Sequence, residues 1–250
     1  MLVGAVALFI VAFIVVAAVG GMLQGGGDDR GGNNAPAGGD DTDLPDASTT
    51  PAADQIADIT LSGSGDTVTE RFELSSGIAI FHMTYDGDRN FIVTLYTSAG
   101  EMVDLLANEI GSYSGSSLVG VTGGPLRASE GEHYLEVKAS GPWEIVVEHP
   151  KATSAPSTPL TLTGSGDEVK AFQFPDGPVQ FTMNHKGTGY FGATLYDANG
   201  RTMDLLANEI GAYSGSSSVS PTGGPFGTSA GVHYIEVSAG GDWSIEITEI

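Results

Sequence analysis

The chain has 250 residues, enough for one or two small domains rather than a large multidomain enzyme. Thirty-one Asp and Glu residues against nine Lys and Arg give a formal net charge of -22, which would repel a polyanion over most of the surface, so we predict no nucleic-acid partner. The chain contains no cysteine, which excludes disulfides, thiolate zinc sites and a cysteine nucleophile.

The first segment, residues 1–23, contains an uncharged apolar run from Leu2 to Leu23. As a helix this run reaches about 30 Å, the thickness of the hydrocarbon core of a bilayer. No Lys or Arg precedes it, and it is longer than the apolar core of a signal peptide. We therefore predict a transmembrane anchor in the cell membrane, single-pass, with the C-terminal domains extracellular. A cleaved signal peptide is the alternative, because small residues near Gly20 resemble a cleavage site.

Residues 24–56 consist of Gly, Asp, Asn, Pro, Ala, Ser and Thr with almost no large apolar side chain. Such a composition cannot recover its ordering entropy by burial. We predict a disordered acidic tether with a root-mean-square span of about 30 Å.

The remainder contains two copies of one unit, which we call module 1 (57–150) and module 2 (160–250), separated by a Pro-rich linker at 151–159. After one deleted residue the copies keep a constant offset of 100. Each module has its own Trp and its own set of apolar segments, so we expect the two to fold separately, joined only by the linker.

Apolar residues in both modules recur with a period of two between Gly, Pro, Asn or Asp turns, the pattern of half-buried strands. Where positions 78–85 are compared with 178–185, one alternating set stays apolar or aromatic, and the other is Pro or polar in the second copy. We assign the first set to the core and the second, which includes Ile78 and Ile80, to the surface. We predict an all-β fold with two tandem jelly-roll or Greek-key β-sandwich domains after one N-terminal transmembrane helix.

The modules contain several motifs in a fixed order, with small differences between the copies: GSGD, F-x-L, F-x-V-x-L, D-L-L-x-N-x-x-G-x-Y-x-G-S and a closing Y-x-x-V-x-A-x-G-x-W-x-I-x-I. Together they resemble small extracellular β-sandwich modules similar to the bacterial pre-peptidase C-terminal domains. The resemblance covers both modules and implies accessory units without catalysis of their own. The high Asp and Glu content also resembles haloarchaeal surface proteins, whose acidic surfaces stay hydrated in high salt.

Four sets of repeated residues are candidate sites. His133 and His233 share the parity of core residues, which favours structural histidines over metal or catalytic ones. The Ser-Gly-Ser-Ser runs that begin at Ser114 and Ser214 lack the G-x-S-x-G elbow of a nucleophile. Trp143 and Trp243 lie on the core parity, which favours packing anchors over sugar platforms. The last set, the GSGD segments, lacks the Lys of a phosphate loop, and we interpret these segments as hairpin turns.

Oxygen ligands of the type that calcium prefers repeat at Asp104, Asn108 and Glu109 and at Asp204, Asn208 and Glu209. Their spacing does not fit an EF-hand, and Asn and Asp often bond to local backbone, so we assign them to turns. His82, His149 and His185 do not recur in both modules. We therefore predict no catalytic, cofactor-binding or metal site and no cofactor.

The sequence predicts a membrane-anchored cell-surface protein that presents two non-catalytic β-sandwich modules for adhesion, envelope structure or accessory binding. Its partners would be the membrane, through the N-terminal helix, and a cell-envelope protein or a glycan. A pilin-like filament subunit and a calcium- or glycan-binding module are the alternatives.

Overall fold

The computed structural model describes residues 56–123, 128–220 and 230–250. They form seventeen strands and no helix, which confirms the all-β prediction. Within the described ranges no helix is long and apolar enough to cross a membrane. The predicted anchor and nearly all of the predicted tether lie outside the described residues.

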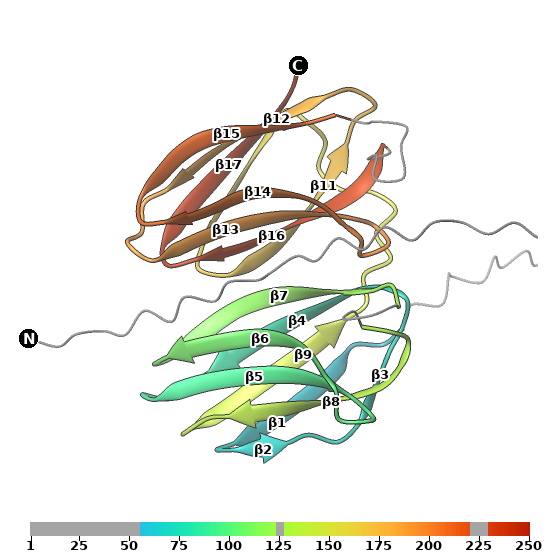
Figure 1. The fold of residues 1–250 in the computed structure, drawn as a ribbon, viewed down its shortest axis with the longest axis vertical. Coiled ribbons are helices and arrows are strands. Elements are labelled where there is room, and N and C mark those ends of the chain that lie inside the picture. Colours follow the sequence, from blue (N-terminus) through green and yellow to red (C-terminus); the bar gives the residue numbers. More distant parts are fainter. Residues whose placement is uncertain (1–55, 124–127, 221–229) are drawn as a thin grey trace, which may run out of the picture. The chain divides into compact units, whose positions relative to one another are not determined.

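Module 1 contains nine strands, coloured blue to yellow in Figure 1. They are β1 (Ile59–Ser64), β2 (Thr67–Val68), β3 (Phe72–Leu74), β4 (Gly77–Tyr85), β5 (Asn90–Thr97), β6 (Met102–Ile110), β7 (Tyr113–Val121), β8 (Gly131–Lys138) and β9 (Pro142–Glu148).

Module 2 contains eight strands with the same order of elements (Figure 1). They are β10 (Leu160–Ser165), β11 (Glu168–Phe174), β12 (Val179–His185), β13 (Tyr190–Asp197), β14 (Thr202–Ile210), β15 (Tyr213–Val219), β16 (Gly231–Ala239) and β17 (Asp242–Glu249).

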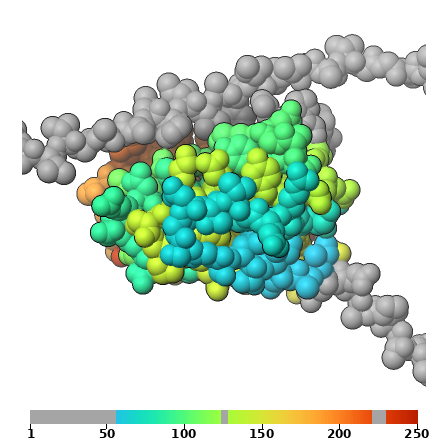
Figure 2. All heavy atoms as spheres, turned by 90° about the horizontal axis from the view of Figure 1, so that it is seen from below, coloured from blue at the N-terminus to red at the C-terminus, as the bar shows by residue number. Residues whose placement is uncertain are grey.

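Each module is built from two antiparallel sheets. In module 1 the strand orders are β1-β9-β4-β7 and β2-β8-β5-β6, with β3 also paired to β8. In module 2 they are β10-β17-β12-β15 and β11-β16-β13-β14. The first and last strands of module 1 lie side by side, and Figure 2 shows the blue-to-cyan and yellow-green segments interleaved on one face.

Two apolar cores lie between the paired sheets, one in each module. The core residues alternate along the strands as the period of two predicts, and Phe81, Phe91, Phe181 and Phe191 are fully buried. Phe91 stacks on Tyr85 with centroids 4.8 Å apart, and Phe191 stacks on His185 at 5.0 Å. The second module therefore retains the aromatic stack although the tyrosine of the first is replaced by histidine.

The GSGD segments are not the hairpin turns that we predicted from the sequence. Each connects a strand of one sheet to a strand of the opposite sheet, so it forms a corner between layers. The Trp143 indole donates to the Gly65 carbonyl at 3.2 Å, and a Cβ on Gly63 would lie 2.5 Å from the same ring. Residue 63 must be glycine because the Trp143 indole, which closes the corner, occupies the space of a side chain there.

Trp143 is buried, and it joins the corner to the core of module 1. We expect Trp143→Ala to reduce the free energy of unfolding by about 3–5 kcal/mol, because it leaves a cavity the size of an indole. Trp143→Phe retains a ring and loses one hydrogen bond, so it should cost about 1–3 kcal/mol. Denaturant titration monitored by circular dichroism measures the free energy of unfolding of both variants. A neutral Trp143→Ala variant would contradict the assignment of this ring to the core.

Candidate functional site at the junction of the two modules

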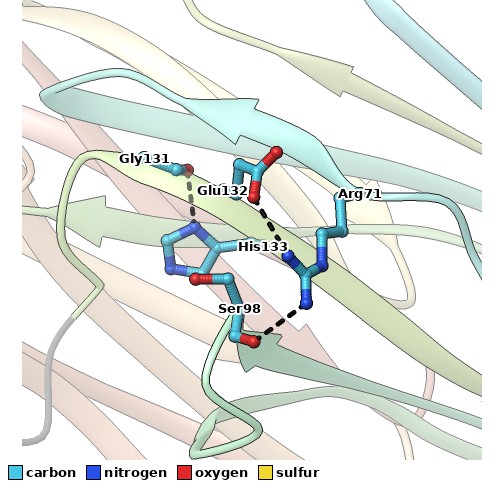
Figure 3. Close-up of polar contacts among 5 residues, drawn as sticks. All are labelled: Arg71, Ser98, Gly131, Glu132 and His133. Carbon is cyan, nitrogen blue, oxygen red and sulfur yellow. Dashed lines mark hydrogen bonds and ion pairs between the residues drawn. The ribbon is translucent and has the colours of Figure 1, made fainter.

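The repeated histidines lie inside the modules. His133 and His233 are both buried, and each ring uses Nδ1 to bond the carbonyl of the glycine two residues earlier, at 2.9 and 3.1 Å. Figure 3 shows His133 with Gly131, next to an exposed ion pair between Arg71 and Glu132. Burial lowers the pKa of His233, whose ring lies 4.9 Å from that of Phe174.

The remaining histidines have separate environments. His82 is exposed and contacts Glu148 at 3.1 Å, whereas His149 is buried and accepts from the Ser75 amide at 3.3 Å. His185 is buried beneath Phe191 and bonds the Gly211 carbonyl at 2.8 Å. The structure does not bring these three side chains into one cluster with His133 and His233.

The Asp104, Asn108 and Glu109 set does not lie in a turn, contrary to our prediction. All three residues lie in β6, the outer strand of its sheet, and their equivalents Asp204, Asn208 and Glu209 lie in β14. Asp104 accepts from the amide of Leu105 at 2.8 Å, beside a β-bulge. We expected these side chains to bond to the local backbone, and Asp104 does so. The bond forms in a bulged edge strand, however, and not in a turn. Among the described residues no group of three or more metal-binding side chains is found.

The serine run that begins at Ser114 has a role that the sequence did not reveal. It lies in β7, the outer strand of its sheet, and it contacts module 2. The Ser116 amide donates to the Asp167 carbonyl at 2.9 Å, and the Val169 amide donates to the Ser116 hydroxyl at 2.9 Å. Module 2 therefore covers the unpaired backbone of this edge strand.

A small apolar cluster also joins the modules. Ile78, Ile80 and Leu118 of module 1 pack with Val232 and Tyr234 of module 2, and all five are buried. Our assignment of Ile78 and Ile80 to the surface is therefore wrong: they point away from the core of module 1 but into a second apolar contact. The linker is consequently not the only connection between the modules.

Glu236 is at the centre of the polar part of this junction. Its Oε1 accepts from the Ser117 hydroxyl and from the Leu118 amide, both at 2.8 Å. Its Oε2 accepts from the Tyr196 hydroxyl at 2.9 Å. Two of these three donors belong to module 1 and one to module 2. Desolvation nevertheless outweighs the hydrogen bonds and raises the pKa of Glu236.

A second carboxylate bridges the modules next to Glu236. Asp167 accepts from the Tyr113 hydroxyl at 2.9 Å and from the Ala239 amide at 2.9 Å. Desolvation raises its pKa, and burial beside this carboxylate raises the pKa of Tyr113. The tyrosine thus remains a neutral donor to the aspartate over the ordinary pH range.

Close backbone contact completes the junction. Gly200 lies in the β13–β14 turn with a φ of 79°, and a Cβ on Gly120 of module 1 would lie 1.9 Å from its carbonyl oxygen. Neither position accommodates a side chain in this arrangement. Beside this contact is a cavity of about 420 Å³ whose lining includes Lys151, Asn199 and Tyr234.

The polar groups of the junction are arranged to hold the two modules together. Ser117 and Glu236 form a hydroxyl–carboxylate pair, which in an open cleft would suit general-base activation of a nucleophile. Here Glu236 also accepts from Leu118 and Tyr196, so its oxygens are already used by donors of the two modules.

Comparison with known proteins gives no family for the chain. Neither the scan against protein-family models nor the search of curated proteins finds a match.

The raised pKa of Glu236 predicts a specific pH dependence. A carboxyl that holds its proton more tightly in the folded chain loses folding stability as the pH rises from the unfolded pKa, about 4.5, to the raised folded value. Glu236→Gln removes this titration, so the free energy of unfolding of the variant should fall less steeply with pH than that of the wild type. The two should diverge by about 1.4 kcal/mol for each pH unit between the unfolded and the folded pKa of Glu236.

Urea titration between pH 4 and pH 8 measures this difference. Glu136→Gln is the matched control, because Glu136 has the same strand position but pairs with Lys138 at 3.4 Å. Glu236→Ala should instead destabilise by about 1–3 kcal/mol, because it leaves the Leu118 amide without its acceptor. Identical slopes for wild type and Glu236→Gln would show that Glu236 is not desolvated.

Proposed function

We propose that the chain is a membrane-anchored cell-surface protein whose two β modules form one non-catalytic unit for adhesion, envelope structure or accessory binding. The observation that carries the proposal is the junction, where partly buried carboxylates join one module to the other. Such a contact suits a unit that holds a fixed shape. The strand orders β1-β9-β4-β7 and β2-β8-β5-β6 support a jelly-roll topology and, with it, the resemblance to extracellular accessory modules.

A second candidate is binding of a glycan or another small polar ligand in the cavity beside the junction. The lining combines the cation of Lys151 with the amide of Asn199 and the ring of Tyr234, from the linker and module 2. Domain boundaries are frequent places for ligand sites. Glycan-array screening of the full chain, with Asn199→Ala as the control variant, tests this candidate.

The anchor is tested by fractionation. We expect the full-length chain to sediment with membranes and to resist carbonate extraction, because Leu2 to Leu23 is uncharged and long enough to span. A chain that begins at Asp58 should remain in the soluble fraction. Recovery of the protein from the medium with its N-terminus near Gly20 would show that the segment is a cleaved signal peptide.

The acidic surface predicts a response to salt. Module 1 carries a charge of about -10 and residues 151–250 about -6, so the repulsion is spread over both modules. The Debye length falls from about 30 Å at 0.01 M to about 3 Å at 1 M, so we expect the thermal midpoint to rise steadily up to molar NaCl or KCl. Differential scanning calorimetry measures it. A midpoint independent of salt would contradict a halophilic protein.

A further inference from the structure

The contact between the modules is heterologous. Module 1 contributes its β7 edge and the adjoining face of the β1-β9-β4-β7 sheet, whereas module 2 contributes the face of the β11-β16-β13-β14 sheet. Because both modules have the same fold, each carries both kinds of surface and uses only one. A heterologous contact between like units leaves one unused surface at each end, where a further unit can add.

We propose that these unused surfaces bind a second copy of this chain head to tail. The tail surface lies on module 2 and comprises Tyr213, Ser216, Ser217 and Ser218 of β15. The head surface lies on module 1 and comprises Asp66, Val68, Tyr96, Tyr134 and Glu136. The head of one copy contacts the tail of another in the way that module 2 contacts module 1.

The tail surface retains the donors of the junction. Tyr213, Ser216 and Ser217 stand where Tyr113, Ser116 and Ser117 stand in module 1. The strand registers are the same, since Ser217 pairs with Phe181 as Ser117 pairs with Phe81. Ser116 is only 7% exposed beneath module 2, whereas Ser216 is exposed on β15, whose outer edge pairs with no described strand.

The head surface retains the two carboxylate acceptors. Asp66 accepts from the Ala139 amide at 3.0 Å, just as Asp167 accepts from the Ala239 amide at 2.9 Å. Glu136 pairs in register with Thr94, as Glu236 does with Thr194.

Aromatic and apolar parts of the head surface are retained too. Tyr96 and Tyr134 stack with centroids 5.3 Å apart, and their equivalents Tyr196 and Tyr234 belong to the junction cluster. Val68 is 65% exposed, although its equivalent Val169 packs against that cluster. An exposed valine beside two carboxylates that no second module covers is a surface suited to a partner.

The differences between used and unused surfaces determine the strength of the contact. Pro178, Gln180 and Ser218 replace Ile78, Ile80 and Leu118 on the tail, while Glu132 replaces Val232 on the head, where it pairs with Arg71 (Figure 3). The contact between copies therefore lacks four of the five buried apolar residues that join the modules within one chain.

One position resists an identical fit. Ser220 replaces Gly120, where a Cβ would meet the turn of the neighbouring unit, so the contact between copies opens there. We therefore expect association to be reversible and weaker than the junction. It also requires salt that screens the repulsion between copies of charge -22.

The absence of cysteine makes cross-linking a direct test. Two full-length variants in nonionic detergent, Ser216→Cys and Val68→Cys, are mixed in molar NaCl and oxidised with copper phenanthroline. A disulfide needs Cα atoms within about 7 Å, so the mixture should give about tenfold more heterodimer than a control mixture of Ser244→Cys and Val68→Cys. Ser244 lies on the same sheet, and its equivalent Glu144 is exposed outside the junction.

An intramolecular pair calibrates the experiment. Ser116→Cys combined with Val169→Cys in one chain should form its disulfide, since the Ser116 hydroxyl accepts from the Val169 amide. Equal heterodimer yields from the two mixtures would overturn the proposal, and so would failure of the intramolecular pair, on which the geometry rests. The contact does not depend on the anchor, so membrane fractionation can succeed or fail independently of it.

Discussion

The arrangement of the two modules depends on one desolvated carboxylate, that of Glu236. Moving a charge out of water is costly, and Glu236 offsets that cost only while Ser117 and Leu118 of one module and Tyr196 of the other donate to it. If the modules separated, the Leu118 amide would lose its acceptor and the apolar faces around Ile80 and Tyr234 would be exposed. The polar and apolar contacts therefore break together.

The hydrogen bonds of this junction define the orientation of the two modules, which its apolar cluster does not do. Burial of Ile78, Leu118 and Val232 is favourable in many orientations, because the hydrophobic effect has no direction. The donors that module 1 provides to Glu236 and Asp167 all lie on β7, at Tyr113, Ser117 and Leu118, so only one register satisfies both carboxylates. The contact of Gly120 with the Gly200 turn excludes side chains and removes a further set of orientations. The apolar residues supply stabilisation, and the polar residues select the geometry.

The sequence predicted what depends on local periodicity. Alternation along strands such as 79–85 identified the inner face and the all-β class, because side chains on a strand alternate between its two faces. It failed where a second surface covers the outer face: Ile78 and Ile80 have the outward parity, and only the position of module 2 buries them. Asp104 was assigned to a turn because nothing local distinguishes a turn from a bulged edge strand that also uses a side-chain oxygen.

Comparing the surface positions of the two copies gives information about the junction that the core positions alone do not give. The Ser-Gly-Ser-Ser run is identical in both modules, yet Ser116 is buried by a neighbour and Ser216 is not. Fold alone does not require serine at an exposed position of an edge strand, since its side chain adds nothing to the core. Four apolar residues of the junction behave differently. Where no neighbour covers the equivalent position, Ile78, Ile80, Leu118 and Val232 are replaced by Pro178, Gln180, Ser218 and Glu132. In a tandem protein of this kind, positions that are apolar in one copy and not in the other therefore indicate where the two copies contact each other. Polar surface residues that both copies share indicate the surface that we propose binds a further copy.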